Sequence, residues 1–318
     1  MGEAALEVQR RRLALGYPVG DDVAGSYGPG TTVAVAAFQE RRGLRCDGVC
    51  GDDTWHALVE AGYRLGDRPL YLGYPLLRGD DVADLQRRVG SLGFDAGRVD
   101  GIFGPRTERA LADFQRNGGL VTDAICGPAT VAALRRLGGW ADAPHSVASV
   151  REREQLRRGP RSLDGRTVAV GESGGLDALA RAVAGAVTAA GGRALLIQHP
   201  DGSEQAAAAN LAEVDAYVGL SLSASSVSVS TAYYRAPSGW ESLEGRRLAE
   251  VVQALLPGIL GATDGGVRGM ALPVLRETRM PAVLAELGAA SVVVERNAEV
   301  AATLAAALQR WIAQPAEV

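Results

Sequence analysis

One pattern occurs twice in the first 137 residues, and this duplication limits the possible fold more than any other feature of the sequence. The two copies lie 76 residues apart and share the following residues: Phe38, Gln39, Leu44, Asp47, Cys50, Gly51, Thr54, Ala57 and Leu58 in the first, and Phe114, Gln115, Leu120, Asp123, Cys126, Gly127, Thr130, Ala133 and Leu134 in the second. Further upstream, Val8-Gln9 matches Leu85-Gln86 at an offset of 77, so a loop between the two segments gained or lost one residue. A constant offset over so many positions indicates duplication.

Each copy predicts a small helical domain. In the second copy, apolar residues spaced by three and four positions predict a first helix from Val82 to Leu92, which ends at Gly93. Residues Thr107 to Asn117 predict a second helix, and a short third helix follows the Gly127-Pro128 pair. We therefore expect two all-α domains of three helices each.

The motifs of these copies resemble the peptidoglycan-binding domain family. The second copy matches closely through its loop Asp100-Gly101-Ile102-Phe103-Gly104, whereas the first has Ser26-Tyr27-Gly28-Pro29-Gly30 in that place. The resemblance implies that exposed loop residues would make any contact with a glycan or peptide. The most apolar shared residues are expected in the helical cores instead, namely Phe38, Trp55, Cys50, Phe114 and Cys126.

The second half of the chain predicts a different architecture. Apolar periodicity stops between Gly138 and Pro160, which indicates a linker with one or two helical turns from Val150 to Arg158. Strand and helix patterns then alternate from Ser162 onward. Predicted strands cover 167–170, 194–198, 216–222, 228–234 and 282–287, and predicted helices cover 176–190, 205–211, 241–256 and 297–312. This alternation predicts an α/β domain whose mostly parallel sheet is covered on both faces.

The fold class expected from the whole sequence is therefore multidomain, with two three-helix domains followed by one α/β domain. The expected boundaries are residues 1–65 and 66–138 for the two repeats, 139–160 for the linker and 161–318 for the α/β domain.

The segment from Val274 to Ser291 places one carboxylate, Glu286, at the end of an apolar run that predicts a buried strand. A buried carboxylate requires a partner or a chemical role. The segment resembles the closing motif of the zinc-dependent N-acetylmuramoyl-L-alanine amidases, and Glu286 falls on their catalytic glutamate. We expect Glu286 to be a structural residue here, bonded to backbone or to an arginine such as Arg276 or Arg279.

The same resemblance implies a zinc ion held by two histidines and one glutamate, with an open position for water. Directly after the first strand, however, where the family has its first histidine, the chain has none, and the place of the glutamate falls on Ser173 or, with a slip of one residue, on Glu172. The second histidine position falls on Ser221 or, with a slip of two, on Ser223. The nearest histidine, His199, is expected in a surface turn. We expect no zinc, no other cofactor and no catalytic residue.

Two repeats followed by an amidase-like domain without its ligands are similar to the CwlM family. Local matches include Tyr63-Arg64-Leu65-Gly66, Gly79-Asp80-Asp81-Val82-Ala83 and Gly159-Pro160. The resemblance implies a cytoplasmic regulator of peptidoglycan precursor synthesis that acts on the enolpyruvyl transferase MurA or the lipid II flippase MurJ. Two alternatives remain open: an amidase with residual activity that uses Glu286 as general base with an unrecognised metal set, and a module that binds peptidoglycan precursors.

Composition agrees with a globular protein that has no nucleic-acid or membrane partner. Hydrophobic residues make up 47% of the chain and the formal net charge is −4. Residues 1–15 lack the apolar core of a signal peptide, and no run is long enough to span a membrane. Three cysteines, an odd number, favour reduced thiols over a disulfide framework. We therefore expect a cytoplasmic location.

Overall fold

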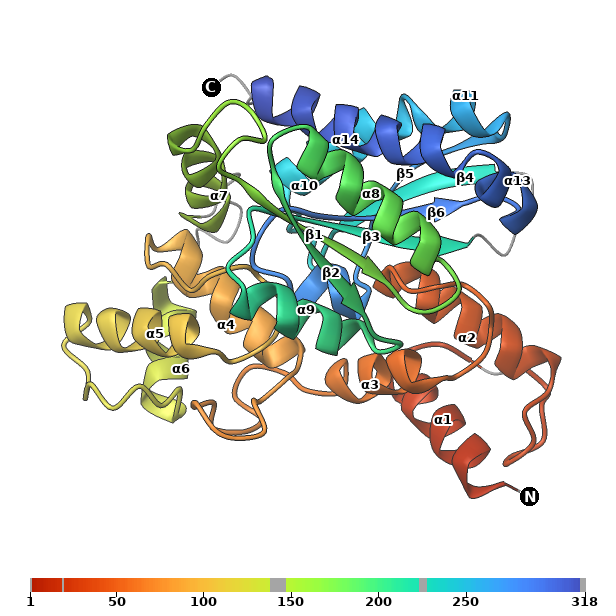
Figure 1. Ribbon diagram of the computed structural model, residues 1–318. Helices are drawn as coiled ribbons and strands as arrows, with labels where there is room; N and C mark the ends of the chain where they lie inside the picture. Colours follow the sequence, from red (N-terminus) through yellow and green to blue (C-terminus); the bar gives the residue numbers. More distant parts are fainter. Residues whose placement is uncertain (1, 19, 138–146, 223–227, 315–318) are drawn as a thin grey trace. The chain divides into compact units, whose positions relative to one another are not determined.

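The computed structural model describes residues 2–18, 20–137, 147–222 and 228–314 (Figure 1). The chain divides into two compact units, Met1–Val150 and Arg151–Val318. The first is helical and the second has the α/β pattern, so the predicted fold class is confirmed.

The N-terminal unit contains two groups of three helices, one for each copy of the repeat. The first group is α1 (Glu3–Ala14), α2 (Pro29–Arg42) and α3 (Asp52–Glu60), and the second is α4 (Asp80–Ser91), α5 (Pro105–Asn117) and α6 (Pro128–Leu137). Each group has its own apolar core, in which Phe38 or Phe114 is almost fully buried. The ring of Tyr17 packs edge-on against Phe38, and the ring of Phe94 packs in the same way against Phe114. The two copies thus repeat even the aromatic contacts.

The shared glutamine of each copy fixes the loop that follows its helix. The side chain of Gln39 is 1% exposed. Its amide nitrogen donates to Asp47 Oδ1 at 2.8 Å, to the carbonyl oxygen of Val49 at 2.9 Å and to Thr54 Oγ1 at 3.0 Å. Its amide oxygen accepts a hydrogen bond from the backbone N–H of Gly48 at 2.9 Å. One buried side chain therefore replaces water for three polar groups of the loop and for the hydroxyl group of Thr54 in α3.

The same hydrogen-bond arrangement recurs at two other buried glutamines, Gln86 and Gln115. Both belong to the second copy, so a smaller unit is repeated within the copy. Gln115 bonds Asp123, Ile125, Thr130 and Ala124, and Gln86 bonds Asp100, Gly101, Ile102 and Thr107. Gln9 also bonds a loop and a threonine, but no aspartate takes part. Each three-helix domain is thus built from two helix–loop segments that are locked by the same chemistry.

The first copy compensates for its divergent loop with Asp22. This carboxylate accepts hydrogen bonds from the backbone N–H groups of Gly28, Gly30 and Thr31, at 3.1, 3.2 and 2.5 Å. These bonds, above all those from Thr31, lower the pKa of Asp22. The carboxylate thereby satisfies amide groups at the start of α2, where a helix leaves them without partners.

The C-terminal unit is built on a sheet of six strands in the order β2-β1-β3-β6-β4-β5. The strands are β1 (Thr167–Glu172), β2 (Arg193–Gln198), β3 (Ala216–Leu222), β4 (Ser228–Tyr234), β5 (Thr263–Met270) and β6 (Ala282–Leu287). Strands β2, β1, β3 and β6 are parallel, β4 is antiparallel to β6, and β5 is parallel to β4. The mostly parallel sheet predicted from the alternation is confirmed.

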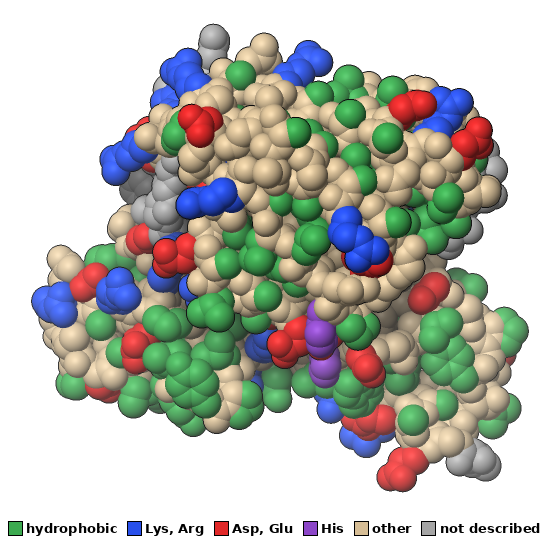
Figure 2. All heavy atoms as spheres, in the orientation of Figure 1, with side chains coloured by type: hydrophobic (Ala, Val, Ile, Leu, Met, Phe, Trp, Pro, Cys, Tyr) green, Lys and Arg blue, Asp and Glu red, His purple; other side chains and the backbone are tan. Residues whose placement is uncertain are grey.

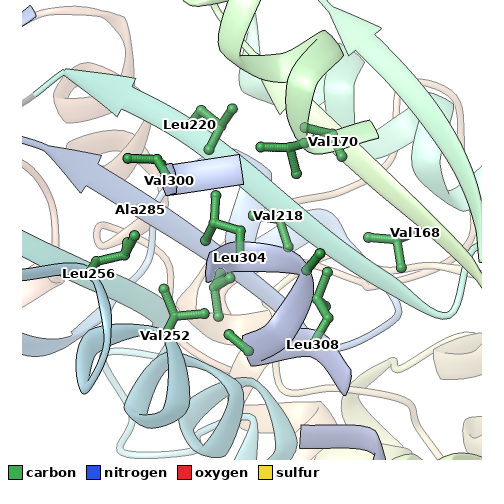
Figure 3. Packing of buried hydrophobic residues seen from close by; sticks show 14 of the residues in the cluster. Val168, Val170, Val218, Leu220, Val252, Leu256, Ala285, Val300, Leu304 and Leu308 are labelled. Atoms are coloured by element: carbon green, nitrogen blue, oxygen red, sulfur yellow. The ribbon is translucent and has the colours of Figure 1, made fainter. Parts of the chain in front are cut away.

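Helices cover both faces of this sheet. One face packs against α8 (Asp177–Ala189), α10 (Leu243–Gln253) and α14 (Asn297–Ala313), and Figure 3 shows Val218 and Leu220 of β3 among Leu304 and Leu308 of α14. The other face forms a second apolar cluster with α9 (Gly202–Leu211) and α12 (Pro273–Glu277). Residues of each inner strand alternate between the two clusters, as a sheet covered on both sides requires.

Several elements were not predicted. Strand β5, α12 and α13 (Ala290–Glu295) were missed, and the predicted helix 241–256 is shorter, with a separate α11 (Leu256–Leu260) after it. Strand β5 carries three glycines and has a low strand propensity, so only its pairing with β4 makes it a strand.

Part of the predicted linker belongs to the C-terminal unit. Residues 138–146 lie outside the described part of the chain, but α7 (Val147–Arg158) is a helix of three turns rather than one or two. Leu156 is buried in the core of the C-terminal unit. The guanidinium group of Arg166 donates to the carbonyl oxygens of Leu156 and Pro160 at 2.8 Å each and forms an ion pair with Asp215 at 3.2 Å. These contacts hold the end of α7 against the sheet.

The surface shows mixed charge. Acidic and basic side chains are scattered over the face shown in Figure 2 and do not gather by sign. Among the described residues, no helix combines the length and the apolar character that a membrane crossing requires.

Candidate functional site

The candidate site lies where the parallel strands β1, β3 and β6 end. In open α/β sheets, ligands bind beyond these carboxyl ends. Strand pairing places Ser221 of β3 directly beside Glu286 of β6, and Ser230 of β4 lies opposite Glu286 on the other side. Paired residues point to the same face of a sheet, so the three side chains share one face. This is the face covered by α9 and α12, because Ala282 and Leu284 of β6 belong to that cluster.

The carboxylate of Glu286 is paired with an arginine. Its side chain is 11% exposed and forms an ion pair with Arg268 of β5, whose guanidinium group reaches across β4. Ser230 Oγ lies 3.1 Å from Glu286 Oε2 and also bonds the same guanidinium group. An arginine partner for Glu286 was expected, and Arg268 is such a partner, although the sequence analysis gave Arg276 and Arg279 as its examples. The partner comes from β5, the strand that the sequence did not reveal.

Glu172 points away from Glu286. Val168 and Val170 of β1 belong to the cluster beneath α8, α10 and α14, and alternation puts Glu172 on that same face. There Glu172 Oε2 accepts hydrogen bonds from the backbone N–H groups of Gly174 at 2.7 Å and Leu176 at 3.1 Å. The carboxylate therefore closes the turn that leads into α8, where the helix dipole favours negative charge.

The residues at the predicted ligand positions do not fit a zinc site of the amidase type. Glu172 and Glu286 lie on opposite faces of the sheet, so they cannot bind one ion together. Ser173 is exposed, Ser221 offers only a hydroxyl group, and Ser223 lies outside the described residues. Nowhere in the described ranges do three histidine, cysteine, aspartate or glutamate side chains come together as a possible metal site. Zinc in proteins requires three or four such ligands.

Side chains fill the space at the end of β1 on the face of Glu286. The hydroxyl group of Tyr217 donates to the side-chain oxygen of Gln205, and a side chain at Gly171 would collide with both groups. Burial raises the pKa of Tyr217, so it is a neutral donor. The amide nitrogen of Gln205 donates to the carbonyl oxygen of His199 at 2.6 Å. This network of buried polar side chains occupies the space beside the end of β1.

His199 lies beyond the end of β2 in an exposed turn. Its ring nitrogen Nδ1 accepts a hydrogen bond from the backbone N–H of Asp201 at 3.1 Å. The histidine thus stabilises the turn before α9.

Arg268 and Ser230 are the site residues that sequence reasoning missed. Ser230 was inside a predicted strand, but its position opposite Glu286 depends on β4 running antiparallel to β6. The only signal for Arg268 was an isolated charge between small residues, Gly266-Val267-Arg268-Gly269, which alone does not identify a partner.

Comparison with known proteins gives the family. The peptidoglycan binding domain family matches residues 1–58 and 78–134, in agreement with the two repeats. The protein named N-acetylmuramoyl-L-alanine amidase CwlM, from Mycobacterium tuberculosis, is 37% identical over 287 residues, which cover 80% of this chain and 70% of that relative. The chain belongs to the CwlM family. The resemblance predicted from the sequence is thereby confirmed.

Other similar proteins share only part of this CwlM-family chain. N-acetylmuramoyl-L-alanine amidase CwlL from Bacillus licheniformis is 32% identical over 159 residues, 43% of this chain and 44% of the relative. The crystal structure of the N-acetylmuramyl-L-alanine amidase Ami1 from Mycobacterium smegmatis aligns with 48% of this chain and 98% of its own at 16% identity, with a TM-score of 0.42. Both of these relatives in sequence, CwlM and CwlL, are named as N-acetylmuramoyl-L-alanine amidases.

Proposed function

We propose that this CwlM-family chain is a non-catalytic regulator or scaffold of peptidoglycan precursor synthesis. The observation that carries the proposal is the placement of the two retained carboxylates. Glu286 is neutralised by Arg268, and Glu172 serves the N-terminus of α8 on the opposite face of the sheet. Both groups that a hydrolase could use have structural partners instead.

The chemistry of the amidases supports this reading. Metal-assisted hydrolysis requires an ion that activates a bound water molecule, and the protein must supply its ligands. The carboxylate of Glu286 already accepts hydrogen bonds from Arg268 and Ser230, so the protein itself occupies the group that an amidase would use toward water. A shared fold does not imply a shared reaction, and here the reacting groups differ while the architecture is kept.

The compartment and the partners belong to the same proposal. Cys46, Cys50 and Cys126, all among the described residues, are thiols rather than halves of disulfides, which fits a reducing cytoplasm. A cytoplasmic protein meets peptidoglycan precursors and their enzymes rather than the finished wall. By family resemblance, the partners would be the transferase MurA and the flippase MurJ, with soluble precursors as possible ligands.

Two other functions compete with regulation. Residual amidase activity is favoured by the names of the relatives, and it would require a metal set outside the positions that the family pattern assigns. Binding of peptidoglycan precursors is favoured by the match of both repeats to the peptidoglycan binding domain family. Muropeptide affinity separates precursor binding from regulation, and bound zinc separates the amidase from both.

Partner capture tests the regulatory proposal. We expect the full chain, used as bait in an actinobacterial lysate, to enrich MurA or MurJ over an unrelated bait of similar charge, and the purified chain to change the rate of the MurA reaction. Calorimetry with muropeptides should give dissociation constants weaker than about 1 mM, which corresponds to about 4 kcal/mol of binding free energy. Micromolar muropeptide affinity together with no enrichment of either partner would overturn regulation in favour of precursor binding.

A further inference from the structure

The outer edge of β2 has no neighbouring strand among the residues that the structure describes. Strand β2 is the first strand of the sheet and pairs only with β1 among the strands that the structure describes. A sheet edge presents unpaired N–H and C=O groups that can template another strand. The sequence and the geometry of β2 determine whether this edge is protected against such pairing.

The hydrogen bonds to β1 identify which groups face outward. The backbone N–H of Arg193 donates to Arg166 O at 2.8 Å, and that of His199 donates to Glu172 O at 3.2 Å. Backbone groups in a strand alternate in direction, so the odd-numbered residues of this segment face β1. Ala194, Leu196 and Gln198 consequently present their N–H and C=O groups to the outside.

The side chains of β2 do not protect this edge. Leu196 is 45% exposed, Ala194 and Leu195 are partly exposed, and Arg193 at the start is the only charged residue of the strand. Natural sheet edges are usually blunted by charge, proline or bulges.

Strand β5, at the opposite edge, has such protection. Its pairing with β4 contains a register shift, Gly266 has a φ of +75°, and the exposed residues include Asp264. Only one of the two edges of this sheet is thus left flat and apolar.

We propose that β2 pairs antiparallel with β2 of a second copy of this chain, around a twofold axis at Leu196. In this register Leu196 lies opposite Leu196 of the second copy, and Ala194 lies opposite Gln198. All three outward-facing residues then exchange backbone hydrogen bonds, about six in total. These backbone hydrogen bonds join the two sheets into one continuous sheet. The same register buries each Leu196 side chain against the Leu196 side chain of the second copy.

The strand itself argues for a second copy as the occupant. Arg193 falls opposite His199 in this register rather than opposite another arginine, so no two arginines meet across the antiparallel pair. Leu195 lies opposite Ile197, and Ala194 lies opposite the uncharged Gln198. The edge is therefore complementary to itself, as a twofold interface requires.

Sedimentation equilibrium of the full chain tests this proposal. We expect a mass that rises with concentration toward twice the 33.0 kDa of one chain. Leu196→Arg should shift the protein to the monomer, because two guanidinium groups would then meet at the axis. Leu211→Arg is the matched control, since Leu211 is 87% exposed on α9 outside the strand, and it should leave the dimer intact. A wild-type chain that stays monomeric overturns the proposal.

Amide hydrogen exchange gives a second readout with residue resolution. The N–H groups of Ala194, Leu196 and Gln198 should exchange more slowly as concentration rises, whereas those of Leu195 and Ile197 should be protected at every concentration by their bonds to β1. A dimer that shows no change at the three outward amides, or that survives Leu196→Arg, has its interface elsewhere and contradicts the proposal. Neither readout depends on whether the chain is catalytic.

Discussion

Replacing Gln39 by leucine is expected to destabilise the first repeat by about 3 kcal/mol, because each of the lost hydrogen bonds contributes about 0.5 to 1.5 kcal/mol. The variant keeps an apolar side chain of similar size in the same place. It leaves Asp47 Oδ1, Thr54 Oγ1 and the backbone of Gly48 and Val49 without the amide that now satisfies them. Buried groups without partners are among the more costly defects in a folded domain.

Hydrogen exchange measured by mass spectrometry can localise this effect. Peptides from α1 to α3 should lose protection in Gln39→Leu, while peptides from the second repeat serve as an internal reference. Glu40→Leu is the matched control, because Glu40 is the exposed neighbour of Gln39 on the same helix. Equal protection in the two variants would show that the glutamine does not lock the loop.

Glu286→Gln is expected to lower the free energy of unfolding of the C-terminal unit by about 2 kcal/mol, less than the 3 to 5 kcal/mol of a fully buried pair, since the Arg268 side chain is 48% exposed. The substitution removes the counter-charge of Arg268 and weakens the acceptor of Ser230. Chemical denaturation followed by circular dichroism measures the change.

A double-mutant cycle isolates the ion pair from other effects. Arg268→Met keeps most of the aliphatic stem, and Glu286→Gln combined with Arg268→Met should cost clearly less than the sum of the single variants. Arg279→Met, which alters an exposed arginine on the segment before β6, is the control and should show no coupling to Glu286. If the losses of unfolding free energy for Arg268→Met and Glu286→Gln were additive, the two side chains would not stabilise the fold as an ion pair.

Patterns with a strong local cause could be predicted from the sequence. The duplication fixed two helical repeats because each copy repeats its own core residues, such as Phe38 and Phe114. Strands β3, β4 and β6 were predicted with their observed bounds, because runs such as 216–222 are apolar and bounded by clear breaks. The position of Glu286 at the end of a buried strand followed from the same reasoning.

The remaining features depend on contacts between distant segments. Strand β5 lacks a pattern of its own, so neither the strand nor Arg268 could be assigned before its pairing with β4 was known. The opposite orientations of Glu172 and Glu286 depend on which face each strand presents, and a one-residue shift would reverse them. The glutamine contacts were equally hidden: Gln39 was visible as a repeated residue, but its loop partners depend on the folded backbone.

The zinc content of the purified chain, measured by elemental analysis together with hydrolysis of muramoyl-peptide substrates by the same preparation, tests the central claim most directly. We predict zinc far below one ion per chain and no release of the stem peptide, even after zinc is added, while an active zinc amidase assayed in parallel does release it. Close to one zinc per chain, with hydrolysis that Glu286→Ala abolishes, would show that the chain is an enzyme and would contradict the proposed regulatory role.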